Sequence, residues 1–206
     1  QDLWKKIVAS QIETGTPYLL YKDACNSKSN QMNLGTIKGS NLCAEIIQKS
    51  TPAETAVCNL ASIALPKFVV NGTFNYKALQ QTVQQAVKNI DRIIDINFYP
   101  TEAAHTSNLK HRPMGIGVQG LADVFQLLHI PFASEKAKEI NRNIFETMYF
   151  AAVNASCTLA EEHHYTFEVT MPFRAKGAYK TYQGSPMSMN KFQFDLWGVT
   201  PSERHD

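Results

Sequence analysis

The stretch AVCNLASIAL, residues 56–65, decides the fold that this sequence predicts. It carries no charge and is followed by Pro66, a pattern typical of a strand buried on both faces. A second strand is expected over 114–118, and it leads into a helix over 121–128. Strands that alternate with helices indicate an α/β fold.

The remaining elements are predicted from apolar spacing and turn signals. A helix is expected over 1–12, a short buried strand over 18–21 and a long loop over 22–40. The dipeptide Asn71-Gly72 favours a hairpin turn. Two longer helices follow in the region 75–162, one from about residue 75 to before Pro100 and one opening at Ser134, a good N-cap.

Composition excludes several classes of protein. The 206 residues carry a net charge of +2 and are 44% hydrophobic, enough for one sizeable core. So small a charge argues against binding to nucleic acid or to an anionic membrane. No apolar run approaches the roughly 18 residues of a membrane span, and no signal peptide is expected. The four cysteines lack CxxC spacing, which favours reduced thiols in the cytoplasm.

The stretch SNLCAEI, residues 40–46, carries the candidate chemistry. In an extended or looped backbone Asn41, Cys43 and Glu45 would point the same way and could face one small ligand. The alternative is a buried structural cysteine between two polar surface residues.

Two phrases in close succession, SNLCAEI (40–46) and AVCNLAS (56–62), resemble the active-site stretch of the large subunit of class I ribonucleotide reductase, in its eukaryotic form. Further motifs agree in order along nearly the whole chain. They are ETGTPY (13–18), KDACN (22–26), NLGTIK (33–38), HRPMGIGVQGLAD (111–123), YQGSP (182–186) and FDLW (194–197). Residues 163–176 depart from the family pattern and are expected to be an insertion.

The resemblance implies a fold larger than this chain. The family's catalytic domain is a ten-stranded α/β barrel with a finger loop through its centre. Residues 1–206 would form part of that barrel, with the finger loop over about 22–50 and a barrel strand over about 56–65. The segment would be an internal piece of a longer polypeptide, inactive alone.

The resemblance also implies roles for individual residues. Cys43 matches the cysteine that becomes a thiyl radical, and Glu45 the carboxylate that takes the 3′-hydroxyl proton. Asn41 matches the amide that fixes the ribose hydroxyls. Cys58 matches one of two cysteines that form a disulfide during reduction. Three neighbours, Ser40, Leu42 and Leu60, are expected to line the substrate site.

The implied substrate is a ribonucleoside diphosphate, reduced to a deoxyribonucleotide for DNA synthesis. No cofactor or metal is expected in this segment, because the radical comes from a metal-containing small subunit and the ATP and dNTP effectors bind elsewhere. Other implied partners are thioredoxin or glutaredoxin and a second large subunit.

Two other functions remain open at this point. One is an inert interaction module without chemistry, and the other is a thiol–disulfide oxidoreductase that uses Cys43 and Cys58. The second is disfavoured because the Glu45 carboxylate would raise, not lower, the pKa of a nearby thiol.

Two local motifs receive plain interpretations. The GxGxxG over 115–120 follows a polar segment rather than an apolar strand, so we expect a strand-to-helix junction and not a dinucleotide site. Residues 110–112 are expected to be a surface cluster, and His163-His164 a solvated helix end.

Overall fold

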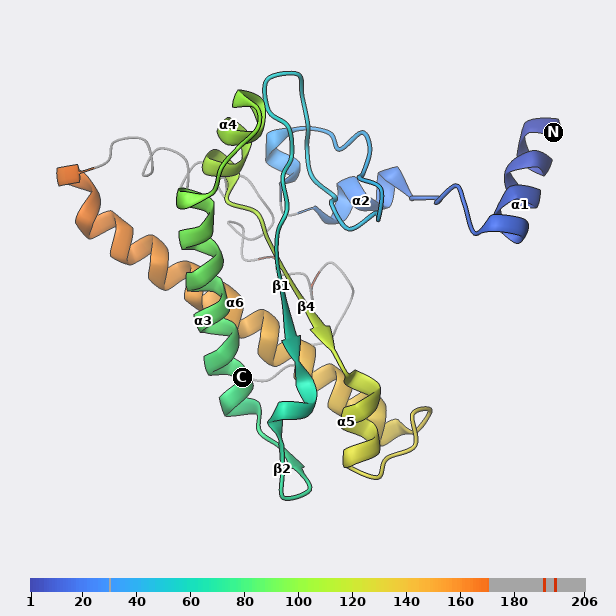
Figure 1. The fold of residues 1–206 in the computed structure, drawn as a ribbon, viewed down its shortest axis with the longest axis vertical. Coiled ribbons are helices and arrows are strands. Elements are labelled where there is room, and N and C mark those ends of the chain that lie inside the picture. The colour runs from blue at the N-terminus through green and yellow to red at the C-terminus, as the bar shows by residue number, and fades with distance from the viewer. Residues whose placement is uncertain (30, 171–190, 192–194, 196–206) are drawn as a thin grey trace.

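The computed structural model describes residues 1–29, 31–170, 191 and 195. Its helices and short strands follow an α/β order (Figure 1), as the sequence predicts. The elements are α1 (Asp2–Thr14), α2 (Lys22–Lys28), η1 (Met32–Leu34), β1 (Asn59–Ala64), η2 (Leu65–Phe68), β2 (Val69–Val70), β3 (Thr73–Phe74), α3 (Tyr76–Ile96), α4 (Glu102–His111), β4 (Met114–Gln119), α5 (Leu121–Leu127) and α6 (Glu135–Thr170).

Helix α1 confirms the helix expected over 1–12. It ends at Gly15, whose left-handed backbone (φ 75°) lets its N–H donate to the carbonyl of Gln11. No residue of α1 is buried, and in Figure 1 the helix lies apart from the other elements.

The prediction of a buried strand over 18–21 is wrong. These residues form no regular element, and their side chains are 46–81% exposed because no described element packs against them. The loop expected over 22–40 is partly wrong, since it contains α2 and η1. Helix α2 has only 7 residues, too few to show a helical stripe in the sequence.

Strands β1 and β4 pair in parallel, with Asn59 opposite Met114 and Ala64 opposite Gln119. Helix α3 packs on both strands and on α6, and α6 crosses behind the strands in Figure 1. The parallel pairing therefore places residues 59–64 directly beside residues 114–119.

Burial in β1 alternates along the strand. Asn59 and Ile63 are buried, whereas Leu60 is 61% exposed. The prediction of burial on both faces is wrong for this structure, because the described helices cover one face only. The strand is also shorter than the predicted 56–65.

The core lies between β1, α3, α5 and α6. Its fully buried members lie on the apolar faces of α3 and α6 and in η2 and α5. These residues are Leu65, Leu79, Val83, Ile94, Val124, Ile144 and Ala151. Burying a side chain of this size stabilises the fold by roughly 1.5–3 kcal/mol.

The two long helices begin where the sequence predicts. The Asn75 side chain accepts a hydrogen bond from the Ala78 N–H at 3.0 Å and caps α3. The Ser134 hydroxyl accepts one from Ala137 N–H at 3.2 Å ahead of α6. Asn71 and Gly72, both with positive φ, connect β2 to β3 in the predicted hairpin.

The GxGxxG segment forms the expected strand-to-helix junction. Gly115 and Gly117 lie inside β4, and Gly120 (φ 74°) is the N-cap of α5. A Cβ on Gly120 would lie 2.6 Å from Pro66 Cγ, so the junction requires glycine. In a dinucleotide fingerprint the glycines form the turn after the strand, whereas two of these three lie within it.

The surface cluster predicted at residues 110–112 is correct for the exposed Lys110 but wrong for His111 and Arg112. Arg112 has a left-handed backbone and donates to the carboxylates of Asp91 at 2.6 Å and Asp95 at 2.8 Å. The side chain of His111 is 6% exposed. Arg112 joins the end of α4 to α3, and Lys110 and His111 join it to the segment before β1.

Other predictions fall at the limits of the described chain. Helix α6 runs to Thr170, through the first half of the expected insertion, and residues 171–176 lie outside the described part. The side chains of His163 and His164 and the motif at 182–186 also lie outside it. Among the described helices, none combines the length and apolarity that a membrane crossing requires.

Candidate active site

The turn that carries Cys43 is organised by Asn41. Its backbone carbonyl accepts from the Ala44 N–H at 3.2 Å, and its side-chain oxygen accepts from the Ile46 N–H at 3.1 Å. Its side-chain nitrogen donates to Glu45 Oε1 at 2.5 Å. The amide is therefore fixed at both ends, and the carboxylate of Glu45 is held against it.

The backbone here is a turn, the looped rather than the extended form of this segment. Ala44 has a left-handed conformation (φ 63°), and this reverses the chain between Asn41 and Glu45. Cys43 and Leu42 lie at the tip, where Cys43 is exposed and Leu42 is 89% exposed. The structure thus brings Asn41 and Glu45 together and leaves Cys43 exposed in the turn between them.

Ser40 has a structural role in this turn. Its hydroxyl donates to the Ile46 carbonyl at 2.7 Å and closes the loop from the other side. The prediction that Ser40 lines a substrate site stays a prediction.

Cys58 comes directly before β1 and is half-buried. Its sulfur lies 3.7 Å from the position that a Cβ on Gly115 would occupy, so the thiol packs over β4. Burial raises the pKa of Cys58, and the negative charge of Glu45 raises it further. The carboxylate of the Cys43 turn therefore acts electrostatically on the second cysteine.

Leu60 lies on the same face of β1 as Cys58, two residues along. Its Cδ2 would lie 2.7 Å from a Cβ on Gly115, so a side chain at 115 would displace it. With its exposed side chain, Leu60 borders the open face of the strand pair beside Cys58. Its assignment to the substrate site stays a prediction.

Two residues outside the predicted site hold the Cys58 segment, and the first is Glu54. Glu54 accepts hydrogen bonds from Lys110 and from His111 Nε2, the latter at 2.8 Å. Burial alone would raise the pKa of Glu54, but the bonds from His111 and Lys110 outweigh it and lower the pKa to about 2.

Asn59 is the second residue that was missed. It forms a buried amide pair with Asn108 of α4, with a distance of 2.7 Å from Asn59 Nδ2 to Asn108 Oδ1. A polar residue at the centre of the apolar run 56–65 was the signal that could have revealed it.

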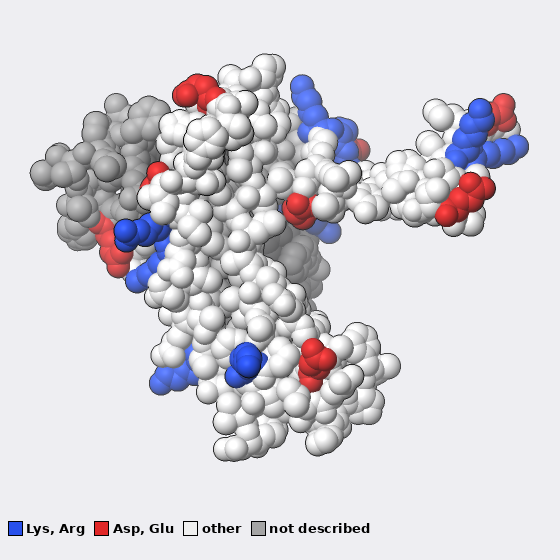
Figure 2. All heavy atoms as spheres, viewed as in Figure 1, with Lys and Arg blue, Asp and Glu red and all other residues white. Residues whose placement is uncertain are grey.

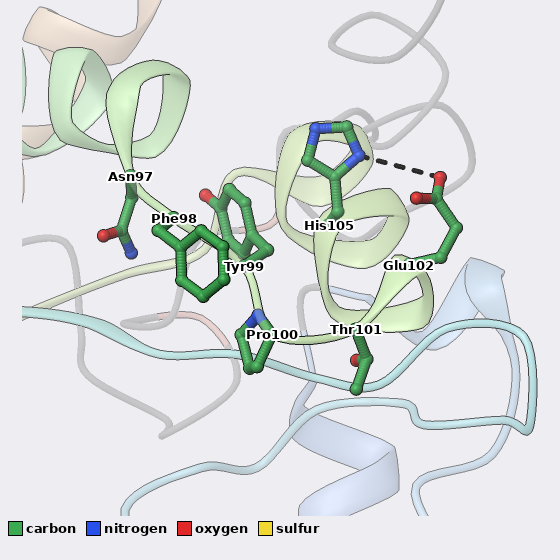
Figure 3. Close-up of a pocket in the computed structure, with 7 residues that line it drawn as sticks. All are labelled: Asn97, Phe98, Tyr99, Pro100, Thr101, Glu102 and His105. Carbon is green, nitrogen blue, oxygen red and sulfur yellow. Dashed lines mark ion pairs between the residues drawn. The ribbon is translucent and has the colours of Figure 1, made fainter.

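A shallow hollow of about 270 Å³ lies elsewhere, at the connection between α3 and α4 (Figure 3). Tyr99 and His105 face one another along its wall, with ring centroids 5.3 Å apart. None of its lining residues belongs to the predicted site. Within the described residues, no three His, Cys, Asp or Glu side chains are grouped so as to hold a metal ion.

The surface agrees with the small net charge. On the face shown in Figure 2, Lys and Arg are scattered among acidic and neutral side chains and form no continuous basic patch.

An exposed thiol beside an amide–carboxylate pair, with a second thiol under the influence of the same carboxylate, is an arrangement suited to redox chemistry on a small substrate. Comparison with known proteins defines the class further. The family model "Ribonucleotide reductase, barrel domain" matches residues 1–206, and the chain belongs to this family.

Individual relatives agree. The chain is 53% identical over 207 positions to the ribonucleoside-diphosphate reductase large subunit of Caenorhabditis elegans, covering 100% of this chain and 25% of the relative. It is 56% identical over 197 positions to the large subunit of Trypanosoma brucei brucei, covering 96% and 22%. The large chain of Neurospora crassa is 52% identical over 208 positions, covering 100% and 21%. The chain thus spans about a quarter of the length of these relatives.

Proposed function

We propose that this chain is the catalytic part of a ribonucleoside-diphosphate reductase large subunit. The observation that carries the proposal is the Cys43 turn, in which Asn41 holds the Glu45 carboxylate at 2.5 Å beside an exposed thiol. The relatives that match 96–100% of this chain are named as large subunits or chains of this enzyme.

The proposed reaction starts at Cys43. As a thiyl radical its sulfur takes the 3′-hydrogen of the ribose, a step beyond any closed-shell side chain. Glu45 is within reach to act as general base for the 3′-hydroxyl proton, and the Asn41 amide orients both the carboxylate and the ribose hydroxyls.

Reduction then uses Cys58. The 2′-hydroxyl accepts a proton and leaves as water, and Cys58 and a partner cysteine supply two electrons as they form a disulfide. Cys43 returns the hydrogen to C3′ and regains its radical. One ribonucleoside diphosphate and one dithiol thus give one deoxyribonucleoside diphosphate, one water and one disulfide. As the resemblance implies, we expect the partner cysteine to lie on an earlier strand, N-terminal to residue 1.

The wider architecture is part of the same proposal. Residues 22–50 would form the finger loop of the ten-stranded barrel, with β1 and β4 as two of its strands. A radical-generating small subunit, thioredoxin or glutaredoxin, a second large subunit and the nucleotide effectors ATP and dNTPs complete the proposed system, which would operate in the cytoplasm.

The alternative of a simple thiol–disulfide oxidoreductase is disfavoured by the structure. Such enzymes depend on a thiolate with a lowered pKa. Here burial and Glu45 both raise the pKa of Cys58, which keeps that thiol protonated at neutral pH.

The test uses the complete large subunit that contains this segment, with its small subunit and reductant. Cys43→Ser should abolish deoxynucleotide formation, because an alcohol O–H bond is too strong to give a comparable radical. Cys157→Ser, which changes another exposed cysteine, is the matched control and should retain activity. Steady-state turnover by Cys43→Ser would contradict the proposal.

A further inference from the structure

The segment that carries Cys58 is attached to one helix on both sides of the cysteine. Ahead of it, Glu54 is bound by Lys110 and His111, both in the last turn of α4. The Thr55 N–H also donates to the Ala103 carbonyl of α4 at 3.1 Å. Directly after it, Asn59 pairs with Asn108 of the same helix.

The Asn59–Asn108 pair is reciprocal and almost fully enclosed. Asn59 Nδ2 donates to Asn108 Oδ1 at 2.7 Å, and Asn108 Nδ2 donates back to Asn59 Oδ1 at 3.2 Å. The two residues are 7% and 0% exposed. A buried amide left without hydrogen-bond partners is costly, so this pairing strongly favours one arrangement of β1 against α4.

Other groups extend the pair into a network across four elements. Asn59 Nδ2 also donates to the Pro113 carbonyl at 2.8 Å, just before β4. Asn108 Nδ2 donates to the Tyr99 hydroxyl, which in turn donates to the Ile94 carbonyl of α3 at 2.7 Å. Tyr99 stands at the wall of the hollow in Figure 3. The start of β1 is thereby joined to α3, α4 and β4.

The network fixes the direction of Cys58 because neighbouring strand residues point to opposite faces. With the Asn59 side chain held on the helix side, Cys58 must face the open side, over Gly115 and in line with Leu60. A slip of one residue would place the thiol under α4 and the amide in the open.

We propose that Asn108, through Asn59, is a positioning residue that holds the Cys58 thiol in place for the reduction step. The inference rests on the proposed function, since it assigns Cys58 to the second half of that reaction. It predicts that loss of the network delays reduction after the 3′-hydrogen has been removed. An intermediate that waits for Cys58 would then release its base instead of becoming product.

The experiment measures the ratio of free base to deoxynucleotide in the complete large subunit with its small subunit and reductant. Asn108→Leu keeps the volume but removes the amide, and Tyr99→Phe removes a single hydroxyl of the same network. Val87→Ala, a cavity in α3 away from the network, controls for lost stability. The ratio does not depend on how much of the enzyme is folded.

For Asn108→Leu we expect kcat to fall about 10–100-fold, the cost of a misplacement near 1 Å, with little change in KM. The base-to-product ratio should rise at least several-fold, and in Tyr99→Phe by a smaller factor. In Val87→Ala the ratio should equal that of the parent. An unchanged ratio in Asn108→Leu overturns the inference, and if that variant does not fold, an unchanged ratio in Tyr99→Phe overturns it.

A second readout separates this inference from the proposed function. In the reduced protein, alkylation of Cys58 relative to Cys157 reports the placement of the thiol without any turnover. We expect Asn108→Leu to speed the alkylation of Cys58 several-fold, because a released strand end exposes a half-buried thiol. If Asn108→Leu speeds the alkylation of Cys58 but the parent makes no deoxynucleotide, the proposed function is refuted. The role of the network in positioning Cys58 is then still supported. If the parent is active and Asn108→Leu leaves the alkylation rate of Cys58 unchanged, only the positioning role of Asn108 is refuted.

Discussion

The two cysteines of the candidate site lie in segments that are held in different ways. The turn at Cys43 is closed by hydrogen bonds between residues at most six positions apart. The segment at Cys58 is held by partners on α4 that lie 48–57 positions away. The first geometry is local, whereas the second exists only when α4 is in place.

This difference suits the proposed division of work. An exposed thiol on a self-contained turn can be reached by a radical that arrives from outside the segment. Cys58 instead has to meet an intermediate at one position, and its raised pKa keeps the proton on sulfur until the departing hydroxyl needs it. The contrast predicts that substitutions at the two places fail in different ways.

The largest expected effect is a difference in products between Cys43→Ser and Cys58→Ser. Both should lose deoxynucleotide formation. Cys58→Ser should release free base, because hydrogen abstraction still occurs and the intermediate decays, whereas Cys43→Ser should release none. The products can be separated by chromatography after reaction of a labelled nucleotide. If neither variant releases free base, the proposed difference in role between Cys43 and Cys58 is wrong.

Glu45→Gln should lower turnover by about 10²–10⁴-fold, the usual contribution of a general base. The amide keeps the shape of the carboxylate, so nucleotide binding should be nearly unchanged. The same variant should lower the pKa of Cys58, since a negative charge that raises it has been removed. Turnover and the pH dependence of Cys58 alkylation measure the two effects. If the turnover of Glu45→Gln lies within twofold of that of the parent, Glu45 is not the general base.

Glu54→Gln should affect stability and depend on pH. The carboxylate has a pKa of about 2 instead of its ordinary 4.5, a difference worth on the order of 3 kcal/mol. Because the folded-state pKa is the lower one, this stabilisation is complete above pH 4.5 and is lost as pH falls toward 2.

Denaturant unfolding of parent and Glu54→Gln at neutral pH and near pH 3 tests this prediction. The gap between the two proteins should narrow at the lower pH. Glu139→Gln is the control, since Glu139 forms an exposed pair with Lys136 at 2.9 Å and such pairs contribute about 0–1 kcal/mol. A gap that does not depend on pH would mean that the carboxylate charge is not what stabilises the segment.

The sequence predicted what depends on local pattern. The apolar stripes of α3 and α6, the Asn71-Gly72 turn and the strand-to-helix junction at Gly120 were all expected and are present. It also singled out Asn41, Cys43 and Glu45, which lie within five consecutive residues.

What the sequence did not predict depends on distant partners. The bonds of Glu54 and Asn59 to α4 cross about fifty positions, and although the polar Asn59 stands out in its apolar run, nothing local identifies either residue's partner. The exposed run 18–21 is apolar enough to predict a strand, but apolarity alone does not show whether a neighbouring strand is present to pair with it. Helix α4 itself was missed, since its sequence, EAAHTSNLKH, has no apolar stripe and is held by polar bonds.

The smallest expected effect is that of Ser40→Ala. The hydroxyl donates to the Ile46 carbonyl at 2.7 Å and more weakly to Asn41 Oδ1 at 3.4 Å, and a hydrogen bond of this kind contributes about 0.5–1.5 kcal/mol. Because the turn is also closed by the two bonds of the Asn41 side chain, we expect the cost to global stability to lie at the low end of that range. Ser27→Ala, which removes a similar bond from α2, is the control. If denaturant unfolding shows Ser40→Ala to cost as much as Glu54→Gln, the Cys43 turn is not self-contained, because its geometry would then be tied to the rest of the fold as firmly as that of Cys58. A KM that rises in Ser40→Ala with stability unchanged would instead show that the hydroxyl meets the substrate as well as the turn.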